Sequence, residues 1–191
     1  MTEFPGIVTL ACHDLRTPLA TVRGFAKTLQ RTAGLDEPES RYLELIDAAS
    51  IELTELLDLL GLLARVESGR QELTPVDLDT GDLARAVASE VGAGQVAVEG
   101  AGEPAQLDGP ILHRALAGLA RCALRHGALE QVQLQVVGTR FELRPVDERL
   151  APILLGDDLK DLGAAGATRI LRGLGGSVEV EGGALVVAPP V

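Results

Sequence analysis

The chain has 191 residues, of which 46% are hydrophobic and 24% are charged, and its formal net charge is −11. This length suits one sizeable domain or two small ones, and the composition is typical of a globular protein. The acidic balance argues against a nucleic-acid partner, because nucleic acids select basic surfaces. No apolar run reaches the length of a membrane span, and no signal peptide is recognisable. The two cysteines, Cys12 and Cys122, form no metal-type pair and suggest buried residues in a reducing cytoplasm.

Residues 7 to 32 are predicted to form a first helix. A heptad pattern runs through it, with Val8, Leu15, Val22 and Leu29 at position a and Ala11, Pro18 and Phe25 at position d. His13 falls at position f, away from this apolar seam. The pattern therefore predicts a histidine on the exposed face of a bundle helix, where it is free to react with a visiting protein.

A second helix is predicted from about residue 36 to residue 66, with an acidic cap at Asp36 and Glu39. Its first apolar stripe consists of Tyr42, Ile46, Ala49, Leu53, Leu56, Leu60 and Leu63. A second stripe consists of Leu43, Leu45, Leu57, Leu59 and Val66. One partner helix cannot cover both stripes, so two hairpins are expected to pack as a homodimeric four-helix bundle.

The remaining residues predict an alternation of helices and strands after an extended linker over residues 73 to 78. Helices are expected near residues 80–92, 109–126 and 161–173. Strands are expected near residues 95–98, 104–107, 131–137, 140–145, 177–181 and 184–188. The period-two runs at 132–136 and 178–180 predict a sheet with one half-covered face. The fold class is therefore α+β: a helical hairpin over residues 1–70, followed by an α/β sandwich over residues 71–191.

The seven residues from His13 to Leu19, HDLRTPL in one-letter code, resemble the H-box of two-component histidine kinases. The resemblance implies that His13 accepts a phosphoryl group and passes it to an aspartate of a response regulator. It also implies that Asp14 orients the imidazole and that Thr17 positions a water for dephosphorylation of the regulator. Arg16 would stabilise the phosphohistidine charge or simply be solvated. Asp14 and Thr17 are alternatively ordinary polar residues of a helix surface.

Four basic residues share much of the helical face on which His13 lies: Arg16, Arg23, Lys27 and Arg31. A basic strip beside a phosphorylatable histidine would suit a phosphate and an acidic partner surface. A solvated polar face is the equally good alternative. Because the H-box starts almost at Met1, sensory input is expected from a partner or from residues outside this sequence.

The second half resembles the ATP-binding domain of the same family, a Bergerat-type α/β sandwich, but its nucleotide-contacting positions have eroded. Gly118 and Cys122 stand where the family has asparagines, and a thiol is a poor ligand for magnesium. Asp147 matches the family's adenine-binding aspartate without the glycines that follow it. Gly163 belongs to a half-retained glycine motif in which Asp161 brings a negative charge that would repel a triphosphate. The resemblance thus implies that ATP does not bind usefully.

These features predict a cytoplasmic histidine phosphotransferase that exchanges phosphoryl groups with response-regulator receiver domains through His13. No cofactor is expected in the chain itself, because the magnesium would come from the receiver domain. One alternative is an active or weakly active ATP-dependent sensor histidine kinase. Another is a non-catalytic inhibitor module that binds a receiver or a kinase. His113 and His126 are reserve candidates for a second acceptor.

Overall fold

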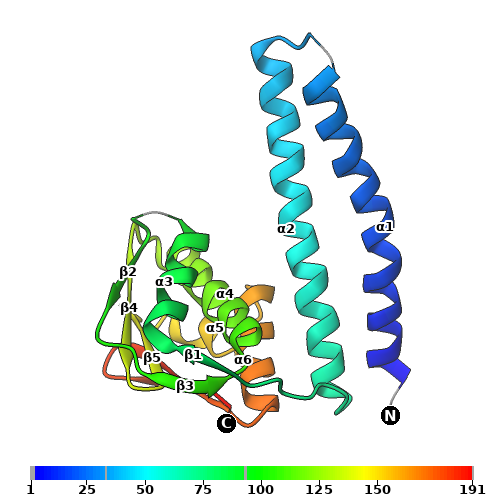
Figure 1. Cartoon of the computed structure of the whole chain (residues 1–191). Coiled ribbons are helices and arrows are strands. Elements are labelled where there is room, and N and C mark those ends of the chain that lie inside the picture. The colour runs from blue at the N-terminus through cyan, green and yellow to red at the C-terminus, as the bar shows by residue number, and fades with distance from the viewer. Residues whose placement is uncertain (1–2, 33, 93, 191) are drawn as a thin grey trace. The chain divides into compact units, whose positions relative to one another are not determined.

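The structure is a computed structural model that describes residues 3–32, 34–92 and 94–190. It divides into two compact units, Met1–Arg70 and Gln71–Val191, which have the same bounds as the two domains expected from the sequence. The first unit consists of two long helices, and the second consists of strands with shorter helices packed on them (Figure 1).

The first unit is a hairpin of α1 (Glu3–Thr32) and α2 (Glu37–Glu67). A capping box starts α2, as its sequence predicts. The Glu39 N–H donates to the Asp36 carboxylate at 2.9 Å, and the Asp36 N–H donates to the Glu39 carboxylate at 3.1 Å. These two bonds satisfy backbone donors that the first turn of a helix leaves without partners. The two predicted helices are therefore confirmed.

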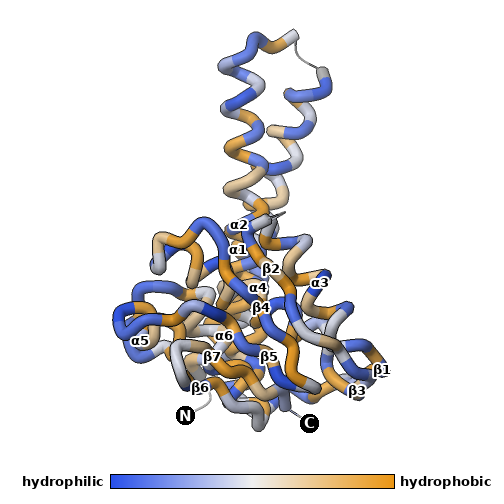
Figure 2. Tube along the Cα trace, turned by 90° about the vertical axis from the view of Figure 1, so that its left-hand side faces the viewer, coloured by the Kyte–Doolittle hydropathy of each residue, from blue (hydrophilic) through white to orange (hydrophobic). Residues whose placement is uncertain are grey.

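The heptad stripe of α1 is not the face that contacts α2. Leu15, Val22 and Phe25 are 54, 50 and 67% exposed, whereas Cys12 and Ala26 are buried. A helix in a single hairpin has one neighbour and can cover only one of its faces. The covered face of α1 is therefore rotated away from the heptad stripe, and apolar residues recur on uncovered positions of both helices (Figure 2).

Over residues 71–92 and 94–190, the second unit contains seven strands: β1 (Val76–Asp79), β2 (Val96–Glu99), β3 (Pro104–Leu107), β4 (Val132–Val137), β5 (Arg140–Arg144), β6 (Ser177–Glu181) and β7 (Ala184–Ala188). Five of them form a mixed sheet in the order β2-β4-β5-β7-β6, in which β2 and β4 are parallel and the other neighbours antiparallel. The other two, β1 and β3, pair antiparallel and place Val76 opposite Leu107. The expected linker over residues 73–78 is thus partly a paired strand.

The described part of this unit also contains four helices: α3 (Thr80–Val91), α4 (Gly109–Gly127), the short α5 (Ala151–Leu154) and α6 (Leu162–Gly173). Alternate residues of the central strands, such as Leu134 and Phe141, are buried in one core with Leu112 of α4 and Leu171 of α6. The residues between them on the strands are only half-buried, as the period-two pattern predicts. The helices therefore pack on one face of a mixed sheet, which confirms the expected α/β sandwich; α5 was not expected.

Within the described residues, no helix combines the length and the apolar character needed to cross a bilayer.

Candidate functional site

His13 lies near the middle of the uninterrupted helix α1, with 77% of its side chain exposed. Its Nδ1 is 3.2 Å from the carboxylate Oδ1 of the neighbouring Asp14, which is also exposed. Position f of the heptad thus faces outward, as predicted. A partner protein can reach the imidazole without displacing any residue of the hairpin.

The contact with Asp14 determines which ring nitrogen of His13 can react. When Nδ1 carries the proton and donates it to Asp14, the lone pair is on Nε2, which points away from that contact. A carboxylate on Nδ1 also stabilises the positive charge that builds on the ring when Nε2 attacks an electrophile. The pair therefore has the chemistry of an oriented nucleophile.

Thr17 and Pro18 occupy the next turn of α1 and are exposed. Thr17 lies four residues after His13, which places it on the same side of the helix. Its carbonyl oxygen accepts a hydrogen bond from the Thr21 hydroxyl at 3.0 Å. Pro18 has no N–H, so it cannot supply the helical hydrogen bond that the carbonyl of Asp14 would otherwise accept.

The basic side chains of α1 are directed mainly toward α2. Arg16 donates through Nε to Asp58 at 3.1 Å, and Arg23 donates through Nε to Asp47 at 2.8 Å. Lys27 lies 4.0 Å from the same Asp47 carboxylate. These three residues share the covered face with Cys12 and Ala26. Their charges are therefore met by α2, which corrects the expectation of a basic strip beside His13.

In the second unit, three of the four positions at which the sequence predicts an eroded ATP site, Gly118, Cys122 and Gly163, lie on helices α4 and α6, and Asp147 lies between β5 and α5. A Cβ added at Gly118 would lie 3.5 Å from the carbonyl oxygen of Gly163, so the two backbones approach closely at these glycines. The Asp147 side chain stabilises the turn that precedes α5, because its Oδ1 accepts from the N–H groups of Arg149 and Leu150 at 3.1 and 2.8 Å. The local geometry gives each of these residues a packing or capping role.

The carboxylate of Asp161 caps the N-terminus of α6. Its Oδ1 accepts from the Ala164 N–H at 2.9 Å, and its Oδ2 lies 3.2 Å from His126 Nε2 and 3.5 Å from Arg125 Nη1. Only 6% of the Asp161 side chain is exposed. A helix N-terminus otherwise attracts a phosphate, but here an internal anion already occupies that position.

Cys122 belongs to the same cluster, although its sequence context indicated only a core residue. It is buried as expected, and burial together with the Asp161 carboxylate raises the pKa of its thiol to about 12. The donor atoms of Cys122, His126 and Asp161 all lie within 4.8 Å of one another. The spacing of Cys122 and His126 by four residues was the only sequence signal of this cluster.

The other two histidines are less accessible than His13. His113 keeps 27% of its side chain exposed and places Nδ1 3.2 Å from Glu90, which also pairs with Arg121. His126 keeps 24% exposed and contacts Asp161. Both contacts join neighbouring elements of the α/β unit, which favours structural roles for these rings.

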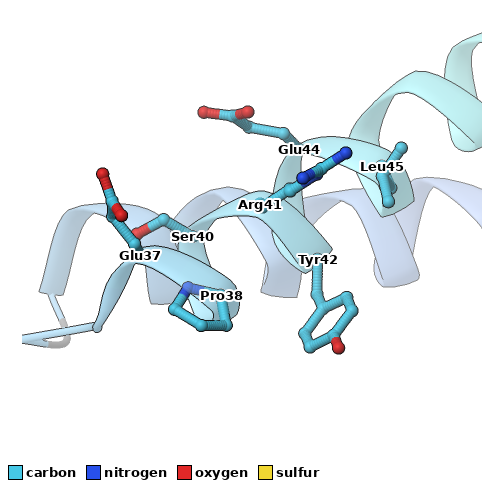
Figure 3. Close-up of a pocket in the computed structure, with 7 residues that line it drawn as sticks. All are labelled: Glu37, Pro38, Ser40, Arg41, Tyr42, Glu44 and Leu45. Carbon is cyan, nitrogen blue, oxygen red and sulfur yellow. The ribbon is translucent and has the colours of Figure 1, made fainter.

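A surface pocket at the start of α2 has no catalytic character. The residues that line it are Glu37, Pro38, Ser40, Arg41, Tyr42, Glu44 and Leu45. All of them come from the first turns of one helix, and their side chains spread apart instead of converging on a point (Figure 3). His13, on the other helix, is not among them. The candidate site is therefore the His13–Asp14 pair.

Comparison with known proteins identifies residues 7–69 as a His Kinase A (phospho-acceptor) domain. The probable sensor histidine kinase TcrY of Mycobacterium tuberculosis is 39% identical over 69 residues, which are 36% of this chain and 14% of that protein. The sensor histidine kinase TrcS of the same organism is 38% identical over 77 residues, which are 40% of this chain and 15% of that protein. The chain thus spans about a seventh of the length of these curated relatives.

Solved structures extend the similarity in fold to the whole chain. The structure of full-length ShkA, crystallised with AMPPNP, aligns with 97% of this chain over 46% of the ShkA chain. The TM-score is 0.66 and the sequence identity is 22%. The structure of the histidine kinase AdeS of Acinetobacter baumannii aligns with 92% of this chain over 94% of the AdeS chain. The TM-score is 0.55 and the sequence identity is 19%. The chain therefore contains a phospho-acceptor domain of the His Kinase A family in its hairpin, and as a whole it is similar in fold to two-component histidine kinases.

Proposed function

We propose that this chain is a histidine phosphotransferase of two-component signalling, which exchanges phosphoryl groups with response-regulator receiver domains through His13. The observation that carries the proposal is the exposed His13 ring, whose Nδ1 contacts Asp14, so that Nε2 remains for reaction. In the same chain, His113 and His126 are directed toward carboxylates of the α/β unit. His13 therefore has both the access and the orientation that transfer requires.

In the transfer step, the lone pair of Nε2 attacks the phosphorus of an aspartyl phosphate on the receiver domain. The P–N bond forms while the P–O bond to the aspartate breaks, and the aspartate leaves as a carboxylate. The positive charge that develops on the imidazole is stabilised by Asp14 at Nδ1. Magnesium bound by the receiver's own acidic residues would neutralise the phosphoryl oxygens. The return step reverses these changes on another receiver.

The residues that remain at the eroded ATP site do not fit magnesium and a triphosphate. Magnesium prefers hard oxygen ligands, whereas α4 offers the Cys122 thiol and the His126 imidazole. At the N-terminus of α6, the buried Asp161 carboxylate would repel the phosphates. No step of the proposed reaction therefore passes through ATP.

A homodimer is part of this proposal. The uncovered faces of α1 and α2 carry large apolar side chains that are about half exposed or more, among them Phe4, Phe25, Tyr42 and Leu53. So many exposed large apolar side chains on two helices are unusual for a monomeric soluble protein. A second hairpin on these faces would complete a four-helix bundle and leave His13 on its outside.

The decisive experiment incubates the purified full chain with a phosphorylated receiver domain and magnesium. We expect acid-labile, base-stable label on the wild-type chain and none on the His13→Ala variant, whose fold should be intact because the replaced side chain is exposed. His113→Ala is the matched control and should still take up label. Label retained by His13→Ala would refute the proposal.

The alternative of an ATP-dependent kinase is favoured by one observation, the complete α/β sandwich fold shared with ShkA. Labelled ATP replaces the phosphorylated receiver in a second arm of the experiment. We expect no label on His13 and no saturable binding of magnesium-ATP at millimolar concentration. Labelling from ATP that His13→Ala abolishes would establish the kinase. Receiver binding without transfer in either arm would establish an inhibitor module instead.

A further inference from the structure

Three side chains of different chemistry converge where α4 packs against α6. Cys122 and His126 lie four residues apart, on the same side of α4. Asp161 reaches them from the N-cap of α6. One sulfur, one ring nitrogen and one carboxylate oxygen lie within 4.8 Å of one another, so small side-chain rotations would bring all three into contact with a single ion.

We propose that Cys122, His126 and Asp161 bind a divalent transition metal ion, most simply zinc. This site would be independent of phosphotransfer through His13. A mixed set of sulfur, nitrogen and oxygen donors suits zinc and related ions and disfavours magnesium and calcium. Three protein ligands leave a fourth, tetrahedral position for water.

The spacing of the donors supports this assignment. The Nε2 of His126 is 3.2 Å from Oδ2 of Asp161. Two ligands of a tetrahedral zinc ion, with bonds of about 2.0–2.1 Å, are separated by about 3.3 Å. The nitrogen and the oxygen are therefore already placed as neighbouring ligands of one ion. Only their protons and orientation need to change.

Asp161 is held in position for this role by its other oxygen. Oδ1 accepts the capping hydrogen bond from Ala164 at 2.9 Å, so Oδ2 remains directed at His126. A second hydrogen bond of this kind is the usual way in which proteins orient a metal-binding carboxylate. Arg125, whose side chain is 60% exposed, forms an ion pair with the same oxygen at 3.5 Å and would give up this pair when an ion binds.

The charges of the bound state would balance. On coordination, the Cys122 thiol releases its proton to water and binds as a thiolate. The thiolate and the Asp161 carboxylate together carry two negative charges, which one divalent cation neutralises. Because Cys122 and Asp161 are buried, this neutrality removes the cost of leaving an unpaired charge in the interior.

The test is a titration of the untagged, metal-free full chain with Co²⁺, followed by displacement with Zn²⁺. We expect a 1:1 complex with a thiolate-to-cobalt charge-transfer band and the visible bands of a tetrahedral ion. Cys122→Ser should abolish the charge-transfer band, and His126→Asn should weaken binding at least about a hundredfold. Cys12→Ser and His113→Asn are the matched controls, and both should behave as wild type.

Circular dichroism of each metal-free variant shows whether it is folded. If Cys122→Ser does not fold, His126→Asn still tests the site. The proposal is overturned if cobalt and zinc show no stoichiometric binding at micromolar concentration. It is equally overturned if the charge-transfer band persists in Cys122→Ser, or if His13→Ala removes the binding instead of His126→Asn.

Discussion

The hairpin and the α/β unit distribute apolar and charged side chains in opposite ways. Of the sixteen large apolar side chains that are exposed among the described residues, twelve lie in the hairpin. Between its helices, the hairpin places the ion pairs of Arg16 with Asp58 and of Arg23 with Asp47 beside a few small buried residues such as Cys12 and Ala26. The α/β unit buries a continuous apolar core between its sheet and its helices.

The two units therefore bury their apolar side chains by different means. The α/β unit satisfies it within one chain, because its sheet and helices cover each other. The hairpin cannot, because two helices leave most of their circumference uncovered. A second copy that covers the apolar faces would still leave His13 exposed, and this combination suits an element that must both assemble and react.

The largest expected effect is on the rate of phosphotransfer, which the proposed function places in the hairpin and not in the α/β unit. Asp14→Asn should slow phosphotransfer from a receiver domain by about 10²–10⁴-fold, because the nucleophile remains while its orienting charge is lost. Single-turnover transfer of label to His13 measures the rate. Asp157→Asn, an exposed acid of the α/β unit, is the control. An unchanged rate in Asp14→Asn would remove Asp14 from the mechanism.

Substitution of two phenylalanines tests whether apolar burial within the chain stabilises each unit. Phe141 is fully buried in the α/β core, whereas Phe25 of the hairpin is 67% exposed. Phe141→Ala should lower the free energy of unfolding of the α/β unit by about 3–5 kcal/mol. Phe25→Ala should leave that transition unchanged and weaken only self-association. Denaturant unfolding at several protein concentrations separates the two effects, and equal losses for the two variants would contradict the comparison.

Self-association should depend on the uncovered stripe of α2. A charge in Leu53→Glu should weaken the dimer at least about a hundredfold, since a buried leucine contributes ~1.5–3 kcal/mol and a two-fold interface contains it twice. Leu159→Glu in the α/β unit is the control, because Leu159 is 78% exposed outside the hairpin. Light scattering measures the mass. A wild-type chain that stays monomeric at about 20 kDa would refute the dimer.

The smallest expected effect is that of the ion pairs between the helices. Asp47→Asn should lower the stability of the hairpin by at most about 1 kcal/mol, because both members of the Arg23–Asp47 pair remain partly exposed to water. The loss should shrink as salt is added. Asp82→Asn, which breaks the exposed pair with Arg85 on α3, should leave hairpin stability unchanged. Thermal unfolding at low and high salt measures the difference.

Periodicity was sufficient to predict most of the elements. The 3.6-residue and two-residue repeats placed the long helices and the strands of the five-stranded sheet close to their observed bounds. The short helix α5 was missed, because four residues that include Pro152 carry no periodic signal. Strand β1 was expected only as a linker, because its pairing with β3 depends on residues about thirty positions away.

The candidate site was predictable to the extent that it is local in sequence. His13 and Asp14 are adjacent in the sequence, and His13 is exposed as expected, although the heptad stripe from which this was inferred is itself exposed. Arg16 and Cys122 were harder, because their partners Asp58 and Asp161 lie far along the chain. The face of α1 that contacts α2 was predicted wrongly, since the heptad stripe has helical spacing but the packed hairpin buries Cys12 and Ala26 instead.

The ion pairs between α1 and α2 have a consequence for how this protein can evolve. Sliding one helix past the other by one turn, about 5.4 Å, would separate Arg16 from Asp58 and Arg23 from Asp47 together. The alignment of the hairpin is thus encoded by polar residues on its inner face. Substitutions on the outer, apolar face can then change which surfaces the hairpin accepts without shifting His13 along its helix. Partner choice and catalytic geometry are therefore separately mutable traits.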